Sequence, residues 1–155
     1  MALKIKDKFI KEDIVDENDN KIGELKFNPD DSRIMKILTE AIVECQEGLK
    51  KIDALGEIKD ISKENLNSVE DFEKEAETFK KIDKGFSVEL NTVESVINKL
   101  SSVFGKETIE LFTKGTMDID TVEPILNFVM PYVKKERNKK IKKYMKNKKN
   151  NSIME

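Results

Sequence analysis

Residues 28–56 read NPDDSRIMKILTEAIVECQEGLKKIDALG, and this stretch decides the fold class. Its first five residues offer several N-cap side chains, with a proline and acids where an opening helical turn tolerates them. Apolar residues then recur with a period of about 3.6 residues, which is typical of an amphipathic helix. Gly56 is the expected end. The apolar face comprises Ile34, Ile37, Leu38, Ala41, Ile42, Cys45, Leu49 and Ile52.

The next segment carries a shorter version of this pattern. A polar connection at 57–65 should lead into a second helix, whose apolar face is Val69, Phe72, Ala76 and Phe79. We place its end at Gly85, because glycine commonly adopts the left-handed conformation that caps a helix. A third helix is predicted over 91–104, where apolar residues again follow the helical period up to Gly105.

The carboxy-terminal third predicts a short helix and a long one. The short helix contains Ile109, Leu111 and Phe112 and should end at Gly115. Asp118, Asp120 and Thr121 can cap the last helix, whose apolar residues run from Val122 to Val133. Pro124 fits the opening turn, whereas Pro131 lies deeper and should kink the helix before its basic end.

The first 27 residues follow a different pattern. Leu3, Ile5, Ile22, Leu25 and Phe27 lie in short alternating runs on either side of the turn-forming segment 16–20. This pattern predicts a β-hairpin over about residues 1–27. The phase of the alternation slips near residues 9 and 10, where a bulge can form.

Composition agrees with a helical protein. Apolar residues make up 37% of the 155 and charged residues 39%, so the core must be thin and the surface highly charged. Six glycines and three prolines are few for a protein rich in strands and turns. We therefore predict a mainly α fold: a small helical bundle with an N-terminal β-hairpin as one domain over 1–133, and a basic helical extension over 134–155 that is frayed or disordered at its end.

Several chemistries lack their usual residues. The chain has no histidine, one cysteine and no clustered glycines, so His-activated nucleophiles, Cys-rich zinc sites and phosphate-binding glycine loops are absent. The acidic turn at Asp16 fails as a calcium loop, because Lys21 and Phe27 replace the required glycine and glutamate. Cys45 lies on an apolar helix face, as an inert thiol would. We expect no enzyme, cofactor or metal.

The basic end is the strongest local feature. Residues 134–155 hold ten Lys or Arg and two acids, whereas acids outnumber bases before them. The run is compatible with a solvated extension, with docking on an acidic protein or with nucleic acid, although Tyr144 is its only aromatic residue for base stacking. Its central lysines are Lys139, Lys140, Lys142, Lys143 and Lys146. Since no signal peptide or apolar span of about 20 residues is visible, we expect a cytoplasmic protein without membrane contact.

One segment resembles a known family. Residues 96–108, VINKLSSVFGKET, precede Phe112 and the run 122–133, which ends in Pro131-Tyr132-Val133. This arrangement resembles the carboxy-terminal half of tail assembly chaperones from long-tailed, siphovirus-like phages or prophages of Gram-positive bacteria. The N-terminal hairpin leading into a capped helix is similar to the start of several of them. The acidic segment 57–84 has no counterpart that we can match.

The resemblance implies a non-enzymatic assembly factor in the host cytoplasm. Such a protein would bind the tape measure protein, assist assembly of the tail tube with the major tail protein, and leave before the virion is complete; self-association is left open. Two alternatives are a nucleic-acid-associated regulator that uses the basic tail and a structural component of the tail. The residues proposed for client contact are Phe104, Gly105, Thr108, Phe112, Phe128 and Tyr132, although core packing is the simpler interpretation of the four aromatic ones.

Overall fold

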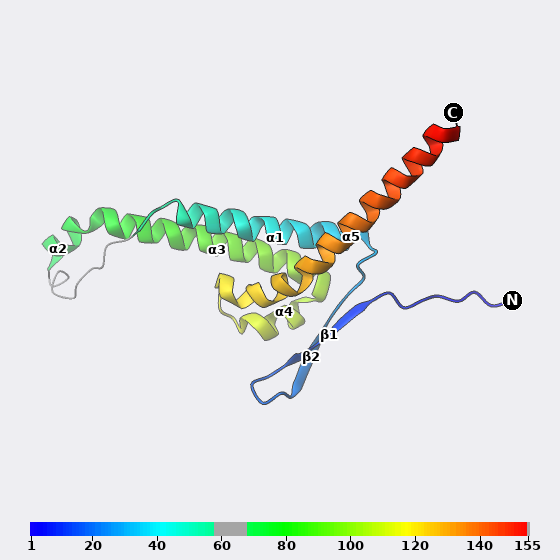
Figure 1. Cartoon of the computed structure of the whole chain (residues 1–155). Coiled ribbons are helices and arrows are strands. Elements are labelled where there is room, and N and C mark those ends of the chain that lie inside the picture. The colour runs from blue at the N-terminus through cyan, green and yellow to red at the C-terminus, as the bar shows by residue number, and fades with distance from the viewer. Residues whose placement is uncertain (58–67, 155) are drawn as a thin grey trace.

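The structure is a computed structural model that describes residues 1–57 and 68–154 (Figure 1). Its elements in chain order are β1 (Ile10–Val15), β2 (Lys21–Phe27), α1 (Ser32–Asp53), α2 (Val69–Lys74), α3 (Ala76–Phe104), α4 (Lys106–Thr113) and α5 (Ile119–Met154). This arrangement confirms the mainly α fold with an N-terminal hairpin. The polar connection predicted at 57–65 falls largely on residues 58–67, which lie outside the described part of the chain.

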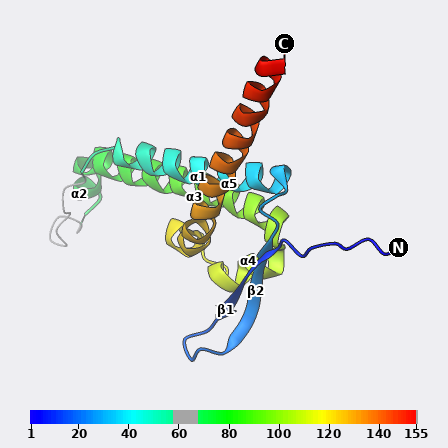
Figure 2. The same cartoon turned by 45° about the vertical axis from the view of Figure 1, so that its right-hand side comes forward.

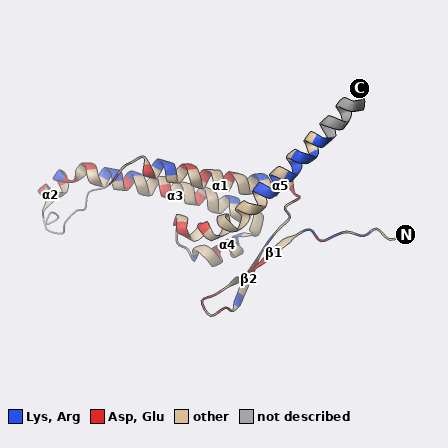
Figure 3. Cartoon of the chain, viewed as in Figure 1, with Lys and Arg blue, Asp and Glu red and all other residues tan. Residues whose placement is uncertain are grey.

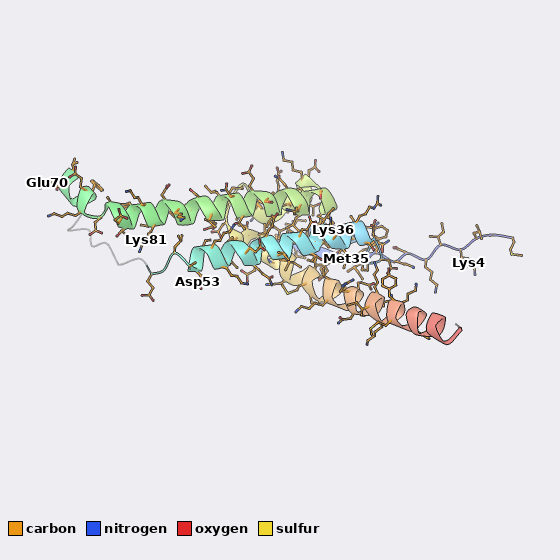
Figure 4. All side chains as sticks on the ribbon, turned by 90° about the horizontal axis from the view of Figure 1, so that it is seen from above. Lys4, Met35, Lys36, Asp53, Glu70 and Lys81 are labelled. Carbon is orange, nitrogen blue, oxygen red and sulfur yellow. The ribbon has the colours of Figure 1, made fainter. Side chains whose placement is uncertain are left out.

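Two long helices form the body of the molecule. α1 and α3 lie side by side, and both the front view and the view from above show that α3 continues beyond the end of α1 at Asp53 (Figures 1 and 4). The first turns of α5, together with α4 and the β-hairpin, pack against the other end of this pair. The core therefore lies at that end. Its largest fully buried side chains are Leu38, Val93, Val96, Leu100, Ile109, Val122, Ile125 and Val129.

The start of α1 confirms the predicted cap. The Asp31 side chain accepts a hydrogen bond of 3.0 Å from the backbone N–H of Arg33. The buried face contains Leu38, Ala41, Ile42 and Cys45 as expected, and also Met35. The helix ends at Asp53, shortly before Gly56 adopts a positive φ of 81°.

The predicted helix end at Gly85 is wrong, because α3 runs unbroken from Ala76 to Phe104. Glycine in a helix interior costs only about 1 kcal/mol relative to alanine, which the packing of a long amphipathic helix easily outweighs. A Cβ at Gly85 would meet Leu55 at 3.7 Å, an ordinary contact. The second and third predicted helices are thus α2 and the single helix α3. Gly105, with φ of 90°, does end α3 as expected.

The hairpin is shorter than predicted. β1 begins at Ile10, and Leu3 and Ile5 are almost fully exposed outside it. The irregularity in the strand pairing lies between Ile14 and Val15 instead of near residues 9 and 10. Alternation alone did not make a strand at residues 1–9, because the observed partner β2 ends at Phe27, opposite Ile10.

The turn of the hairpin is formed where expected, at residues 16–20. The Asp16 carboxylate accepts hydrogen bonds of 2.9 Å from the backbone N–H groups of Asn20 and Asn18. These bonds, led by that of Asn20, hold the pKa of Asp16 below its ordinary value. The Asp16 carboxylate thus stabilises the turn that the sequence predicts.

α5 begins as predicted and changes direction. The Asp118 side chain accepts from the N–H of Asp120 at 2.8 Å, and the apolar face buries Val122, Ile125 and Val129. Figures 1 and 2 show a bend between the first turns of α5 and its lysine-rich end, in the part that contains Pro131. This bend agrees with the loss of a backbone donor at proline. The backbone is helical to Met154, and fraying beyond Lys146 stays a prediction.

Candidate protein-binding surface

Three of the six predicted site residues meet around one buried ring. Phe27 of β2 is only 2% exposed. The rings of Phe104, Phe128 and Tyr132 stand edge-on to it, with centroids 6.0, 6.2 and 5.6 Å away. Such edge-to-face pairs stabilise packing beyond the area they bury. The cluster therefore fastens the hairpin to the end of α3 and the first half of α5.

The other three predicted residues lie around α4. Gly105 is exposed in the link from α3, and Thr108 is half-buried. Phe112 is half-buried, packs against the core and lines a hollow of about 490 Å³ beside the hairpin turn. All four aromatic residues are partly buried and pack against the core, in agreement with the simpler interpretation. Their contact with a client stays a prediction.

A larger apolar surface runs along α3. Its apolar residues follow alternating spacings of three and four over most of the helix, the pattern of a helix that packs against other helices along a continuous stripe. Burial along this stripe is uneven: Val93 is fully buried, whereas Phe86, seven residues earlier, is 62% exposed. The stripe comprises Phe79, Ile82, Phe86, Leu90, Val93, Ile97, Leu100 and Phe104.

Burial along α1 is also uneven, but here the exposed residues lie at the carboxy-terminal end of the helix. Its stripe consists of Met35, Leu38, Ile42, Cys45, Leu49 and Ile52. The first four are buried, whereas Leu49 is 48% exposed and Ile52 is half-buried. Because α1 and α3 run in opposite directions, the exposed ends of the two stripes lie at the same end of the pair (Figure 1).

The position of α5 explains where burial stops. Its first backbone N–H, at Ile119, donates to the Glu89 carboxylate over 3.5 Å, so α5 starts level with the middle of α3. Residues of α3 before Glu89 project past that point, where their described neighbours are the end of α1 and, at the start of α3, the short helix α2, whose Phe72 ring lies 6.1 Å from that of Phe79. We call the uncovered apolar end of the pair the open seam. It comprises Leu49, Ile52, Leu55, Ile82, Phe86 and Leu90.

The open seam is shallow and continuous. One hollow of about 410 Å³ is lined by Leu49 and Ile52 with Lys50 and Asp53. A second, of about 220 Å³, lies beyond the last turn of α1 and is lined by Ile52, Leu55, Ile82 and Phe86, among others. Ile52 lines both, so the two are adjacent. A shallow apolar trough between charged rims is suited to a helix of a partner, which buries its own apolar face there.

The opposite side of the helix pair is held by polar contacts. Lys99 of α3 donates to Glu44 of α1, and the two form an ion pair. Burial opposes ionisation of Glu44, but hydrogen bonds from Lys99 and Ser95 outweigh it and lower the pKa of this carboxyl. Nearby, Gly48 allows close approach, since a Cβ there would lie 2.4 Å from Thr92 Oγ1. These contacts hold the two helices together on this side.

The single thiol, Cys45 of α1, is buried, as its sequence position predicts. Burial, and secondarily the charge of Glu123, raises the pKa of the Cys45 thiol. A raised pKa keeps the group protonated, and the protonated thiol is a poor nucleophile. In the described part of the chain, no group of three or more His, Cys, Asp or Glu side chains is placed to hold a metal ion.

The basic residues form a protruding helix. Figure 3 shows Lys and Arg along the part of α5 that leaves the body. Lys140 contacts the body through a hydrogen bond of 2.5 Å to Ser32 Oγ at the start of α1. Lys139, Lys142, Lys143 and Lys146 are exposed. The structure thus separates the basic surface from the open seam.

Sequence reasoning missed most of the open seam. Phe86 and Leu90 belong to no predicted helix face, because the sequence predicts that a helix ends at Gly85. The signal was nonetheless present, since the spacing of three and four residues continues through Gly85 from Phe79 to Phe104. Isolated glycine within such a pattern weakens a helix without ending it.

A comparison of the chain with protein-family models, curated proteins and solved structures gave no match. Among the helices that the structure describes, none is long and apolar enough to cross a membrane.

Proposed function

We propose that this protein is a non-enzymatic chaperone of phage tail assembly, which binds helices of the tape measure protein and assists assembly of the tail tube. The observation that carries the proposal is the open seam. An apolar stripe of the type that normally packs against another helix continues on α1 and α3 past the point where α5 ceases to cover it.

The chemistry of the surface favours a helical client. Apolar side chains at helical spacing on two adjacent helices match the apolar face of a third, as in other helix-in-groove complexes. Charged residues such as Lys50, Asp53, Lys81 and Glu89 border the hollows and keep the open end hydrated. A tape measure protein with long amphipathic helices is a client of that kind, and the sequence resemblance at residues 96–133 supports this choice.

The proposal is tested by producing the full chain together with a coiled-coil fragment of the tape measure protein encoded near it. We expect the two to co-elute from a sizing column, and the fragment to remain in solution only when the chain is present. Separate elution, with the fragment equally insoluble in both cases, would contradict the proposal. Finding the chain in purified virions would instead favour a structural tail component.

A further inference from the structure

The end of α5 is itself an amphipathic helix. Ile141, Tyr144 and Met145 are spaced so that they share one helical face, and all three are exposed. We call residues 134–146 the basic extension; they hold eight Lys or Arg and one Glu. An exposed apolar face flanked by lysines is unusual for a purely solvating segment, since solvation requires only the charges.

The open end of the helix pair is acidic overall. Residues 45–57 and 69–90, which form it, hold ten acidic and six basic residues, although the side chains that line the hollows of the open seam include two of each sign, Lys50 and Lys81 with Asp53 and Glu89. The molecule therefore carries two exposed apolar surfaces of opposite charge. Opposite charge favours their encounter and sets their orientation, while the apolar faces supply the area to bury.

The basic extension does not reach the open seam of its own chain. Lys140 contacts Ser32 at the start of α1, whereas the seam lies at the end of α1, about 30 Å away for a helix of this length. Beyond Lys140 the helix leads away from the body, and the two surfaces lie at opposite ends of the molecule (Figures 1 and 2). A second molecule is needed to bring them together.

We propose that the basic extension of one copy of this protein docks on the open seam of a second copy. The lengths are compatible: the apolar face from Ile141 to Met145 is about 7.5 Å long, and the α3 side of the seam, from Ile82 to Leu90, is about 13.5 Å long. Because each copy has both surfaces at opposite ends, a two-fold pair satisfies both contacts at once and closes. Ile141, Tyr144 and Met145 then cover the seam, and the lysines face the acids of α1 and α3.

This self-association covers the apolar surface when no client is present. A client helix would have to displace the extension, so the two would compete for one surface. The inference does not depend on the proposed function, since it stands on the charges and exposed side chains of this chain alone. A monomer that binds the tape measure fragment would overturn only the self-docking, and a dimer that ignores the fragment would overturn only the chaperone proposal.

Cysteine pairing tests the contact on the full chain. In a background in which Cys45→Ala removes the native thiol, a Phe86→Cys chain is mixed with a Tyr144→Cys chain under mild oxidation. We expect a mixed disulfide between the two chains. The matched control is Val43→Cys, an exposed site on α1 outside the stripe, which should give little mixed disulfide with Tyr144→Cys. Equal yields from Phe86→Cys and Val43→Cys would overturn the proposal.

Charge reversal gives an independent reading by light scattering. The unmodified chain should be a dimer, and Lys142→Glu with Lys143→Glu should weaken dimerisation by about tenfold or more. Asp53→Lys with Asp83→Lys on the other surface should do the same, and mixing the two variants should restore dimers. A monomeric unmodified chain, failure of the mixture to associate, or association lost on nuclease treatment would overturn the proposal, the last in favour of a nucleic-acid ligand.

Discussion

Gly48 sets how closely α1 and α3 approach. A methyl group at this position would lie 2.4 and 2.6 Å from the Oγ1 and Cγ2 atoms of Thr92, a β-branched side chain that moves little. Thr92 is further fixed by donating to the carbonyl of Val88 at 2.7 Å. The contact leaves no room for a larger residue.

We therefore predict that Gly48→Ala destabilises the fold by about 1–3 kcal/mol, despite the higher helix propensity of alanine. The control is Gly85→Ala in α3, where the new methyl meets only Leu55 at 3.7 Å and stability should rise by up to about 1 kcal/mol. Urea unfolding measures both. If Gly48→Ala matches Gly85→Ala, the close approach has no energetic importance.

Glu44 should give the fold a dependence on acid. Its carboxyl has a lowered pKa in the folded chain, so it stabilises the fold above the pKa of the unfolded chain, about 4.3, and this contribution is lost as pH falls through the folded value. Glu44→Gln should lower the melting temperature at pH 7, and the difference from the unmodified chain should shrink as pH falls through the folded-state pKa of Glu44. Lys99→Met removes a hydrogen-bond donor of Glu44 and should therefore abolish the same pH-dependent contribution to stability. Parallel melting curves at all pH values would contradict this role.

At the scale of elements, Phe27 joins the β-hairpin to the aromatic side chains of the helices, beside the buried Ile14 and Leu25. Phe27 is the only ring in contact with Phe104, Phe128 and Tyr132 together in the described part of the chain. Phe27→Ala should cost about 3–5 kcal/mol of unfolding free energy, as for other buried phenylalanines. Phe9→Ala, which removes an exposed ring beneath Lys26, should cost about 1 kcal/mol or less. Similar losses in urea unfolding would mean that the aromatic cluster does not fasten the hairpin.

The elements differ in how far the sequence predicts them. α1 and the start of α5 were predicted well, because side-chain caps at Asp31 and Asp118 coincide with the onset of apolar periodicity. The sequence predicts two helices in place of α3, because glycine commonly ends a helix. In the structure, the apolar stripe along α3 outweighs this local preference of Gly85. Residues 1–9 alternate without forming a strand, since strand formation depends on a partner elsewhere in the chain.

The candidate site shows the same limit. The sequence indicated Phe104, Phe128 and Tyr132 as surface or core, and the structure places them around Phe27. The open seam could not be found from periodicity alone, because periodicity shows which residues share a face but not where a neighbouring helix begins. The extent of the seam is set by the start of α5, where the backbone N–H of Ile119 donates to the Glu89 carboxylate. These two residues are 30 positions apart in the chain.

At the scale of the whole molecule, the pair of α1 and α3 is covered at one end and open at the other. We propose that a client helix binds the open end. Leu49 and Val43 allow a matched comparison, because both are aliphatic residues of α1 with 48% and 42% exposure, but only Leu49 belongs to the stripe. Either can be changed to lysine with little effect on the fold.

The most direct test is the dissociation constant between the full chain and a tape measure helical fragment, measured for both variants. Leu49→Lys should weaken binding by about tenfold or more, because a charge would be buried against the client. Val43→Lys should bind like the unmodified chain. Equal affinities for Leu49→Lys, Val43→Lys and the unmodified chain would contradict the claim that the open seam is the client-binding surface.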